Sequence, residues 1–167
     1  MGSQKEADTM KIVVDTREQA PFAFSGVQYQ GAEVTTGTLD TGDYSLAGLT
    51  DKVAVERKSV PDLVACLGRE RERFERELLR ARALESFAVV VEGTWEELAR
   101  GQYRSKLSPG AACQSVCAFV ARWHIPFLFC GSRAGAEYVC YSLLRQYLKG
   151  AQDRYRTLVR AHGEEAA

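Results

Sequence analysis

The chain has 167 residues, of which 46% are hydrophobic and 26% are charged, as is typical of one globular domain with a buried core. No apolar run approaches the roughly 20 residues of a transmembrane helix, and no signal-peptide pattern opens the chain. We therefore expect a soluble intracellular protein without a membrane partner, cytoplasmic in a prokaryote or phage and nuclear in a eukaryote. The net charge of zero excludes a uniformly basic nucleic-acid-binding protein, but not one with segregated charges.

The first part of the chain predicts a polar, disordered segment over residues 1–9, followed by two strands. The first strand is expected over 11–15 and ends in Asp15. A loop with aromatic residues begins at Gln19, and a second strand is expected over 32–39, interrupted by a glycine.

The most informative stretch is the apolar, β-branched run 53–58, which ends in Glu-x-Lys and predicts a buried strand. Side chains alternate along a strand, so Glu56 and Lys58 project from the same face. The segment 42–47 predicts a preceding strand opened by Asp43, and the short link between the two predicts an antiparallel hairpin. Because such a connection can be staggered, the hairpin alone does not decide whether Asp43 lies beside Glu56.

If these residues meet, they form the two acids and one amine used in metal-dependent phosphodiester hydrolysis. Asp43 and Glu56 are candidate ligands of Mg²⁺ or Mn²⁺, which otherwise keep mostly water and phosphate oxygens as ligands. Lys58 would orient or help deprotonate the attacking water and balance charge in the transition state. Many strands end in charged residues, so this spacing is weak on its own.

Helices and one more buried strand are predicted next. A helix is expected over 59–67, and a second over 69–80, where opposite charges stand three and four residues apart. The unbroken apolar run 87–91 predicts a central strand buried on both faces. Glu92 at its end is either an outer carboxylate of the metal site or a capping or surface residue.

The last third of the chain predicts a short helix from Thr94 to Gly101, a helix over 108–123, a strand over 125–130 and a long helix over 132–149. The loop before residue 108 carries Arg104 and Lys106 and is a candidate DNA-contacting arm. The long helix has an apolar face wider than one sheet surface requires, which fits either a subunit interface or packing on the sheet.

Five cysteines are present, and no Cys-x-x-Cys pair or nearby histidine completes a zinc site. We interpret them as buried free thiols.

The charges are segregated along the chain. Between residues 100 and 160 two acids, Glu137 and Asp153, stand against ten basic residues: Arg100, Arg104, Lys106, Arg122, Arg133, Arg145, Lys149, Arg154, Arg156 and Arg160. A basic half beside an acidic pocket suits a protein that binds phosphates and cleaves one, although a solvated helix surface gives the same pattern.

Three motifs in order resemble the XPF family of structure-specific endonucleases: Val-Asp-Thr-Arg-Glu at 14–18, Gly-Asp at 42–43, and Glu-Arg-Lys-x-x-x-Asp at 56–62. The resemblance covers roughly residues 11–148. It implies a restriction-endonuclease-like α/β fold, with a central mixed β-sheet flanked by helices, in a nuclease domain over 10–150. Residues 151–167 are then a C-terminal extension, too short for the helix-hairpin-helix module of many relatives.

The resemblance also implies roles for individual residues. Asp43 and Glu56 become the metal ligands and Lys58 the catalytic lysine, with Asp15, Arg57 and Asp62 in support. We expect Arg57 to hold a neighbouring carboxylate, with Asp15 the candidate, or to form a buried ion pair that fixes the hairpin. Asp62 is alternatively a helix N-terminal charge favoured by the helix dipole.

The family carries a basic residue near the active site in the helix over 69–80, so Arg69 or Arg73 is expected to reach the scissile phosphate. The function implied is a Mg²⁺- or Mn²⁺-dependent DNA endonuclease acting on branched or flap DNA in repair or recombination. The alternatives are a catalytically silent DNA-binding scaffold of the same fold, or a restriction or recombination nuclease without structure specificity. The partners implied, besides DNA, are a second copy of the chain or a separate DNA-binding protein.

Overall fold

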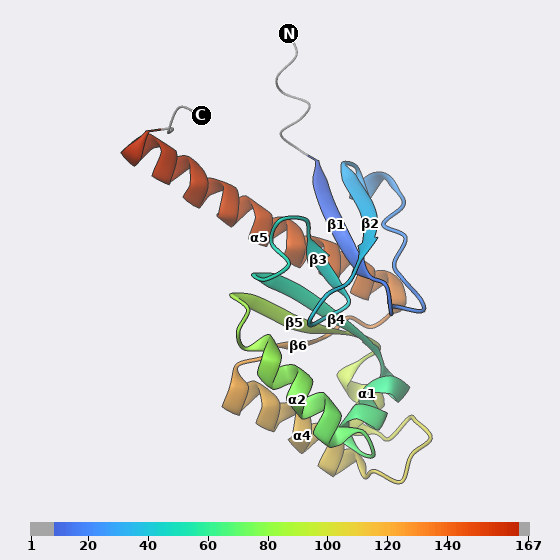
Figure 1. Ribbon diagram of the computed structural model, residues 1–167. Helices are drawn as coiled ribbons and strands as arrows, with labels where there is room; N and C mark the ends of the chain where they lie inside the picture. The colour runs from blue at the N-terminus through green and yellow to red at the C-terminus, as the bar shows by residue number, and fades with distance from the viewer. Residues whose placement is uncertain (1–8, 164–167) are drawn as a thin grey trace.

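A computed structural model describes residues 9–163, in which a six-stranded sheet carries helices on both faces (Figure 1). The elements in chain order are β1 (Met10–Asp15), a 3-10 turn (Val27–Tyr29), β2 (Ala32–Gly37), β3 (Tyr44–Leu46), β4 (Val53–Ser59), α1 (Val60–Leu67), α2 (Arg71–Ala81), β5 (Ser86–Glu92), α3 (Trp95–Ala99), α4 (Pro109–Trp123), β6 (Phe127–Phe129) and α5 (Arg133–His162). The predicted segment 1–9 lies outside the described residues except for Thr9.

The strand order across the sheet is β2-β1-β3-β4-β5-β6. The pairs β1/β2, β4/β5 and β5/β6 are parallel, whereas β1/β3 and β3/β4 are antiparallel. The predicted central mixed sheet and the predicted hairpin of β3 and β4 are therefore confirmed. Parallel neighbours and helix cover on both faces also explain why β5 is an unbroken apolar run.

Alternation along the strands divides the apolar residues between two cores, one on each face of the sheet. On the first face Ala54 packs with residues of α1, α2 and α4, among them Phe74 and Phe119. On the second face Val53 and Val55 pack with residues of α5. Because Glu56 and Lys58 share the parity of Ala54, they project toward α1 and α2.

Polar caps start the helices where the sequence predicts them. The Oγ of Ser59 accepts a hydrogen bond from the backbone of Asp62, and the Oγ of Ser108 accepts one from Ala111. Thr94 forms a complete capping box with Glu97.

Some predicted ends are wrong. The second strand stops at Gly37 because the chain then turns Leu39 into the interior, and the last strand keeps only residues 127–129. The long helix continues past residue 149 to His162. Residues 151–162 contain neither proline nor glycine, so nothing in them stops a helix.

The interpretation of the cysteines is correct only in part. All five are free, but only Cys66 and Cys140 are buried, and Cys117 is exposed on α4. Among the described residues, no helix combines the length and apolar character required to cross a membrane.

Candidate active site

The hairpin places two carboxylates side by side. Tyr44 pairs with Val55, so the antiparallel register puts Asp43 opposite Glu56. Gly42 has a φ of +84°, and a Cβ there would lie 2.8 Å from the Cβ of Ala54, so the close approach of the strands requires glycine. The backbone N–H of Arg57 donates to Oδ2 of Asp43 at 2.8 Å, which fixes that carboxylate toward β4.

Glu56 and Lys58 meet on one face of β4, as strand alternation predicts. The Nζ of Lys58 lies 2.6 Å from Oε1 of Glu56 and 5.6 Å from the centre of the Phe74 ring on α2. Glu56 is only 3% exposed, and its Oε2 has no hydrogen-bond partner among the described residues. Burying a carboxylate oxygen without a hydrogen-bond donor costs free energy. A bound cation or a proton on this oxygen would remove that cost.

The pKa values of the site are shifted because two acids and a lysine lie close together in a buried position. Burial raises the pKa of Asp43 to about 6, against the hydrogen bond from the backbone of Arg57. Burial and the charge of Asp43 raise the pKa of Glu56 well above its ordinary value. Burial alone would lower the pKa of Lys58, but the carboxylates around it, Glu56 first, hold that pKa above its ordinary value. Lys58 is therefore a positive charge beside two carboxylates whose pKa values are raised. A bound divalent cation would favour the ionised form of both carboxylates.

The donor set fits a divalent cation. Asp43 and Glu56 offer oxygen ligands of the kind that Mg²⁺ and Mn²⁺ prefer, and the unpartnered Oε2 of Glu56 is available to one. Within residues 9–163 no group of three or more His, Cys, Asp and Glu side chains is arranged to hold a metal ion. The protein would thus supply two carboxylates, and water and phosphate the remaining ligands.

Arg57 points to the opposite face of β4, but the expected pairing with Asp15 is wrong. Its guanidinium binds Glu18 at 2.7 Å and Glu92 at 3.2 Å. Arg133 from the start of α5 also binds Glu92, at 2.8 Å. Glu92 is accordingly a member of an ion-pair network, which ties β4 and β5 to the loop after β1 and to α5.

Asp15 binds Arg17 instead, because both lie at the turn where β1 ends. The Nε of Arg17 is 2.8 Å from Oδ2 of Asp15, and the backbone of Leu39 donates to Oδ1 at 2.9 Å. Burial acts to raise the pKa of Asp15, but these hydrogen bonds and the charge of Arg17 outweigh it and lower the pKa. Asp15 thus ties the turn after β1 to the segment after β2 at the mouth of the site.

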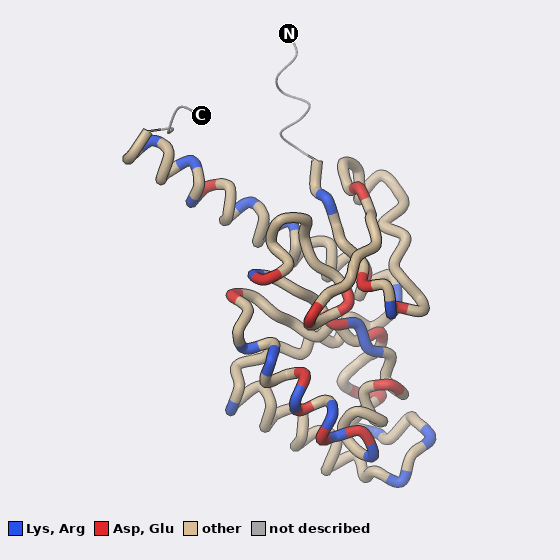
Figure 2. Tube along the Cα trace, viewed as in Figure 1, with Lys and Arg blue, Asp and Glu red and all other residues tan. Residues whose placement is uncertain are grey.

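A cleft of about 600 Å³ opens over these groups, between the ends of β1 and β4 and the helices α1 and α2. Charged residues of both signs lie along α2 and at the end of β4 (Figure 2).

Residues 14–142 match the sequence model of the ERCC4 domain. The chain belongs to the ERCC4 domain family. The predicted resemblance to the XPF family is thereby confirmed. A search of curated protein sequences found no match.

The fold of this ERCC4 domain resembles that of solved structures, two of which are the following. XPF from Aeropyrum pernix is 25% identical with a TM-score of 0.65, and the match covers 82% of this chain and 61% of that one. XPF from Aeropyrum pernix in complex with DNA is 24% identical with a TM-score of 0.65, covering 84% of this chain and 66% of that one. This chain covers less than two thirds of the length of either solved chain. The shared fold confirms the predicted restriction-endonuclease-like architecture.

The cleft of the ERCC4 domain brings together most of the predicted site residues. Its lining includes the six predicted catalytic residues, Asp15, Asp43, Glu56, Arg57, Lys58 and Asp62, and the two predicted phosphate contacts of the helical region, Arg69 and Arg73. Asp62 is exposed in the first turn of α1, where its charge also lies at the N-terminal end of the helix dipole.

The predicted DNA-contacting arm is not part of the cleft. Arg104 and Lys106 are exposed in the loop before α4. None of the ten basic residues between 100 and 160, all in the described part of the chain, lines the cleft. Several are paired with acids, as Arg154 is with Glu85. The basic half of the sequence is therefore not one surface facing the carboxylates.

Sequence reasoning missed some members of the cleft. Glu77 and Arg80 of α2 line it, and the negative charge of Glu77 acts on Asp43, Glu56 and Lys58. The available signal was helical spacing, because Glu77 and Arg80 stand four and seven residues after Arg73 and so share its face of α2.

Proposed function

We propose that this ERCC4 domain is a Mg²⁺- or Mn²⁺-dependent DNA endonuclease that hydrolyses phosphodiester bonds at branched or flap DNA in repair or recombination. The observation that carries the proposal is the register of β3 and β4, which joins Asp43, Glu56 and Lys58 at the floor of one open cleft. Asp43 and Glu56 would hold the divalent ion, which supplies a Lewis acid to the phosphate and to the attacking water.

The residues of the chain have separate tasks in this reaction. The backbone of Arg57 and the packing of the hairpin fix Asp43, so both carboxylates are oriented before substrate arrives. Lys58 is held as a cation by Glu56 and placed by Phe74, so it can donate to a phosphate oxygen and balance the charge that develops there. Arg69 and Arg73 at the exposed edge of the cleft would hold the neighbouring phosphates.

The choice of DNA as substrate is supported by family membership and by the related Aeropyrum pernix XPF, whose structure includes DNA. A catalytically silent scaffold is the main alternative. The three polar groups that the chemistry needs all lie in the cleft, and the buried oxygen of Glu56 lacks a partner among the described residues, which favours an enzyme. A restriction or recombination nuclease without structure specificity would use the same groups and differ only in substrate.

Cleavage assays would test the proposal. Labelled duplex, flap, splayed-arm and single-stranded DNA are incubated with Mg²⁺, with Mn²⁺ or with EDTA. We expect metal-dependent cutting by the wild type, fastest on branched substrates, and a loss of at least a hundredfold in Lys58→Ala. Lys52→Ala, which removes an exposed lysine of the same hairpin, is the matched control and should cut normally. Binding without cutting under every condition would instead establish the scaffold, and equal cutting of all substrates the nonspecific nuclease.

Partners remain part of the proposal. Residues 9–163 would act either as a homodimer or beside a separate DNA-binding protein. Light scattering coupled to size-exclusion chromatography at two concentrations distinguishes these, because a homodimer doubles the measured mass.

A further inference from the structure

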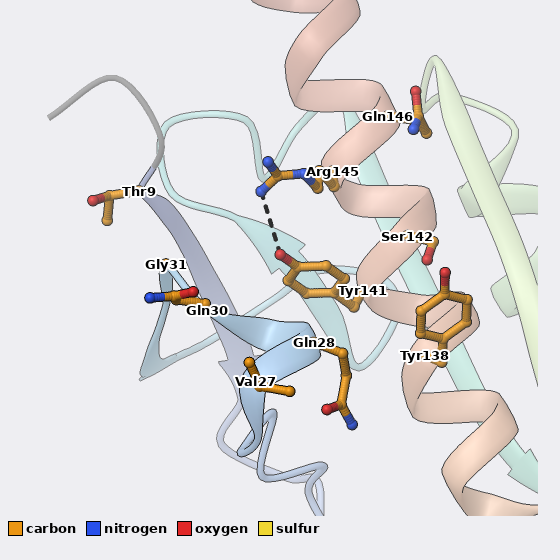
Figure 3. A pocket seen from close by; sticks show the side chains of 10 residues that line it. All are labelled: Thr9, Val27, Gln28, Gln30, Gly31, Tyr138, Tyr141, Ser142, Arg145 and Gln146. Carbon is orange, nitrogen blue, oxygen red and sulfur yellow. Dashed lines mark hydrogen bonds between the residues drawn. The ribbon is translucent and has the colours of Figure 1, made fainter. Parts of the chain in front are cut away.

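A groove follows α5 at the end of β1 that lies away from the catalytic cleft. Its main cavity, of about 960 Å³, separates α5 from the 3-10 turn and the start of β1 (Figure 3). A second cavity, of about 360 Å³, continues it toward the end of α5, since the two share Thr9, Arg145 and Gln146 in their linings. The two cavities therefore lie next to each other along α5, and we call them together the groove.

The α5 wall of this groove presents an aromatic ring followed by cations. Tyr138, Arg145, Lys149 and Arg156 are separated by seven, four and seven residues, so they share one face of the helix. Tyr138 is 56% exposed, so its ring can accept a stacking partner. Figure 3 shows Gln28 on the opposing wall, where its side-chain amide can donate and accept hydrogen bonds.

The charge of the groove differs from that of the whole chain. The full sequence has equal numbers of acids and bases. Among residues 9–163 the two cavities are lined by Arg145, Lys149 and Arg156 and by one acid, Asp153, which is paired with Arg156 at 2.9 Å. Arg145 donates to the hydroxyl of Tyr141, a further polar contact of this wall. In the described part of the chain, cations therefore outnumber acids in the lining of the groove, beside an exposed aromatic ring.

We propose that this groove binds single-stranded DNA, with a base stacked on Tyr138 and the phosphates following Lys149 and Arg156. Exposed aromatic rings combined with a positive channel are the features by which proteins bind single strands without reading sequence. In a duplex the bases are already stacked on one another and paired, so none is free to stack on the ring of Tyr138. The inference deepens the proposed function by giving the single-stranded arm of a branched substrate its own site.

The position of the groove suits that role. The groove is lined by residues at the start of β1, and the cleft by Asp15 at its end. Six residues of strand span about 17 Å, the length of a few nucleotides. The groove lies on the α5 face of the sheet and Glu56 and Lys58 project toward α1 and α2, so a branched DNA with its scissile phosphate in the cleft would carry its single strand past the edge of the sheet to the groove.

The test is fluorescence anisotropy with a labelled 15-nucleotide oligo(dT) in EDTA, which prevents cutting. Tyr138→Ala should weaken binding about tenfold, and Tyr138→Phe, which keeps the ring, should bind like the wild type. Tyr155→Ala is the matched control, because Tyr155 is 64% exposed on the same helix outside the groove. Circular dichroism confirms that each variant is folded.

A second measurement uses salt. Replacing Lys149 and Arg156 by glutamine should make the slope of log affinity against log salt shallower by about 1.4, two phosphate contacts on a single strand. Arg122→Gln, an exposed cation of α4, should leave the slope unchanged.

The outcomes separate this inference from the proposed function. Equal affinity of the wild type and Tyr138→Ala for the oligonucleotide would refute the proposal that the groove binds single-stranded DNA, even where metal-dependent cutting persists. A loss of affinity in Tyr138→Ala with no cutting by the wild type would support the groove and refute the nuclease.

Discussion

The burial of Asp43 has a measurable consequence for stability. In the metal-free protein this carboxylate is confined near Glu56 and Glu18, and its pKa is raised to about 6. Asn has nearly the same shape as Asp and can still accept the hydrogen bond from the backbone of Arg57. We therefore expect Asp43→Asn to stabilise the protein in EDTA at neutral pH.

The magnitude follows from linkage. The folded-state pKa of Asp43 lies about two units above the ordinary value of 3.8, and each unit corresponds to about 1.4 kcal/mol, so ionisation costs the folded state about 3 kcal/mol. The folded protein binds more protons than the unfolded chain between pH 4 and pH 6. The contribution of Asp43 to stability is therefore intact below pH 4 and is lost as the pH rises through 6. The gain from Asp43→Asn should be near zero at pH 4 and reach about 1 to 3 kcal/mol at pH 8.

Urea unfolding in EDTA at pH 4, 6 and 8 measures this gain. Asp40→Asn, which removes an exposed carboxylate from the rim of the same cleft, should change the free energy of unfolding by less than about 0.5 kcal/mol. Added Mg²⁺ should stabilise the wild type and not Asp43→Asn. A variant that is less stable than the wild type at pH 8, or a gain that does not vary with pH, would refute the reasoning.

Three further predictions concern other parts of the site. Arg57→Met should lower the free energy of unfolding by about 3 to 5 kcal/mol, because it leaves the buried carboxylate of Glu18 without its partner; urea unfolding measures this. Glu77→Gln should raise the Mg²⁺ concentration for half-maximal cutting about fivefold, since it removes roughly 1 kcal/mol of attraction for the ion. A disulfide reagent at pH 8 should modify Cys117 quickly and Cys66 slowly, because burial raises the pKa of Cys66 to about 11 and leaves about one thiolate in a thousand.

Matched variants serve as controls. Arg73→Met breaks only an exposed ion pair with Glu70 and should cost less than about 1 kcal/mol; equal losses in both arginine variants would contradict the network around Arg57. Glu72→Gln lies on an exposed part of α2 outside the cleft, so an equal effect of both glutamate variants would show that the position of Glu77 is unimportant. Rapid modification of Cys66 in the folded protein would contradict its burial.

Local rules predict much of the site. Alternation along β4 correctly places Glu56 and Lys58 on one face and Arg57 on the other, because a strand has a side-chain period of two whatever surrounds it. Polar caps likewise predict where α1 and α4 begin, since a serine before a proline satisfies free backbone N–H groups within one turn.

Relations between distant segments could not be obtained from such rules. The partner of Arg57 is Glu18, 39 residues away, and not Asp15, because the turn after β1 gives Asp15 its own arginine. The role of Glu77 depends on the packing of α2 against α1 and β4, which carries its face over the cleft.

The sequence by itself determined the family, the strand that carries the acid and the amine, and the alternation of elements along the chain. Only the tertiary structure decided that Asp43 lies opposite Glu56, and that the basic residues of the second half lie outside the cleft. The physical reason is the distance along the sequence over which each interaction acts. Strand alternation and helix caps act within a few residues, whereas register, ion-pair partners and the shape of a cleft depend on how segments far apart in the chain pack together.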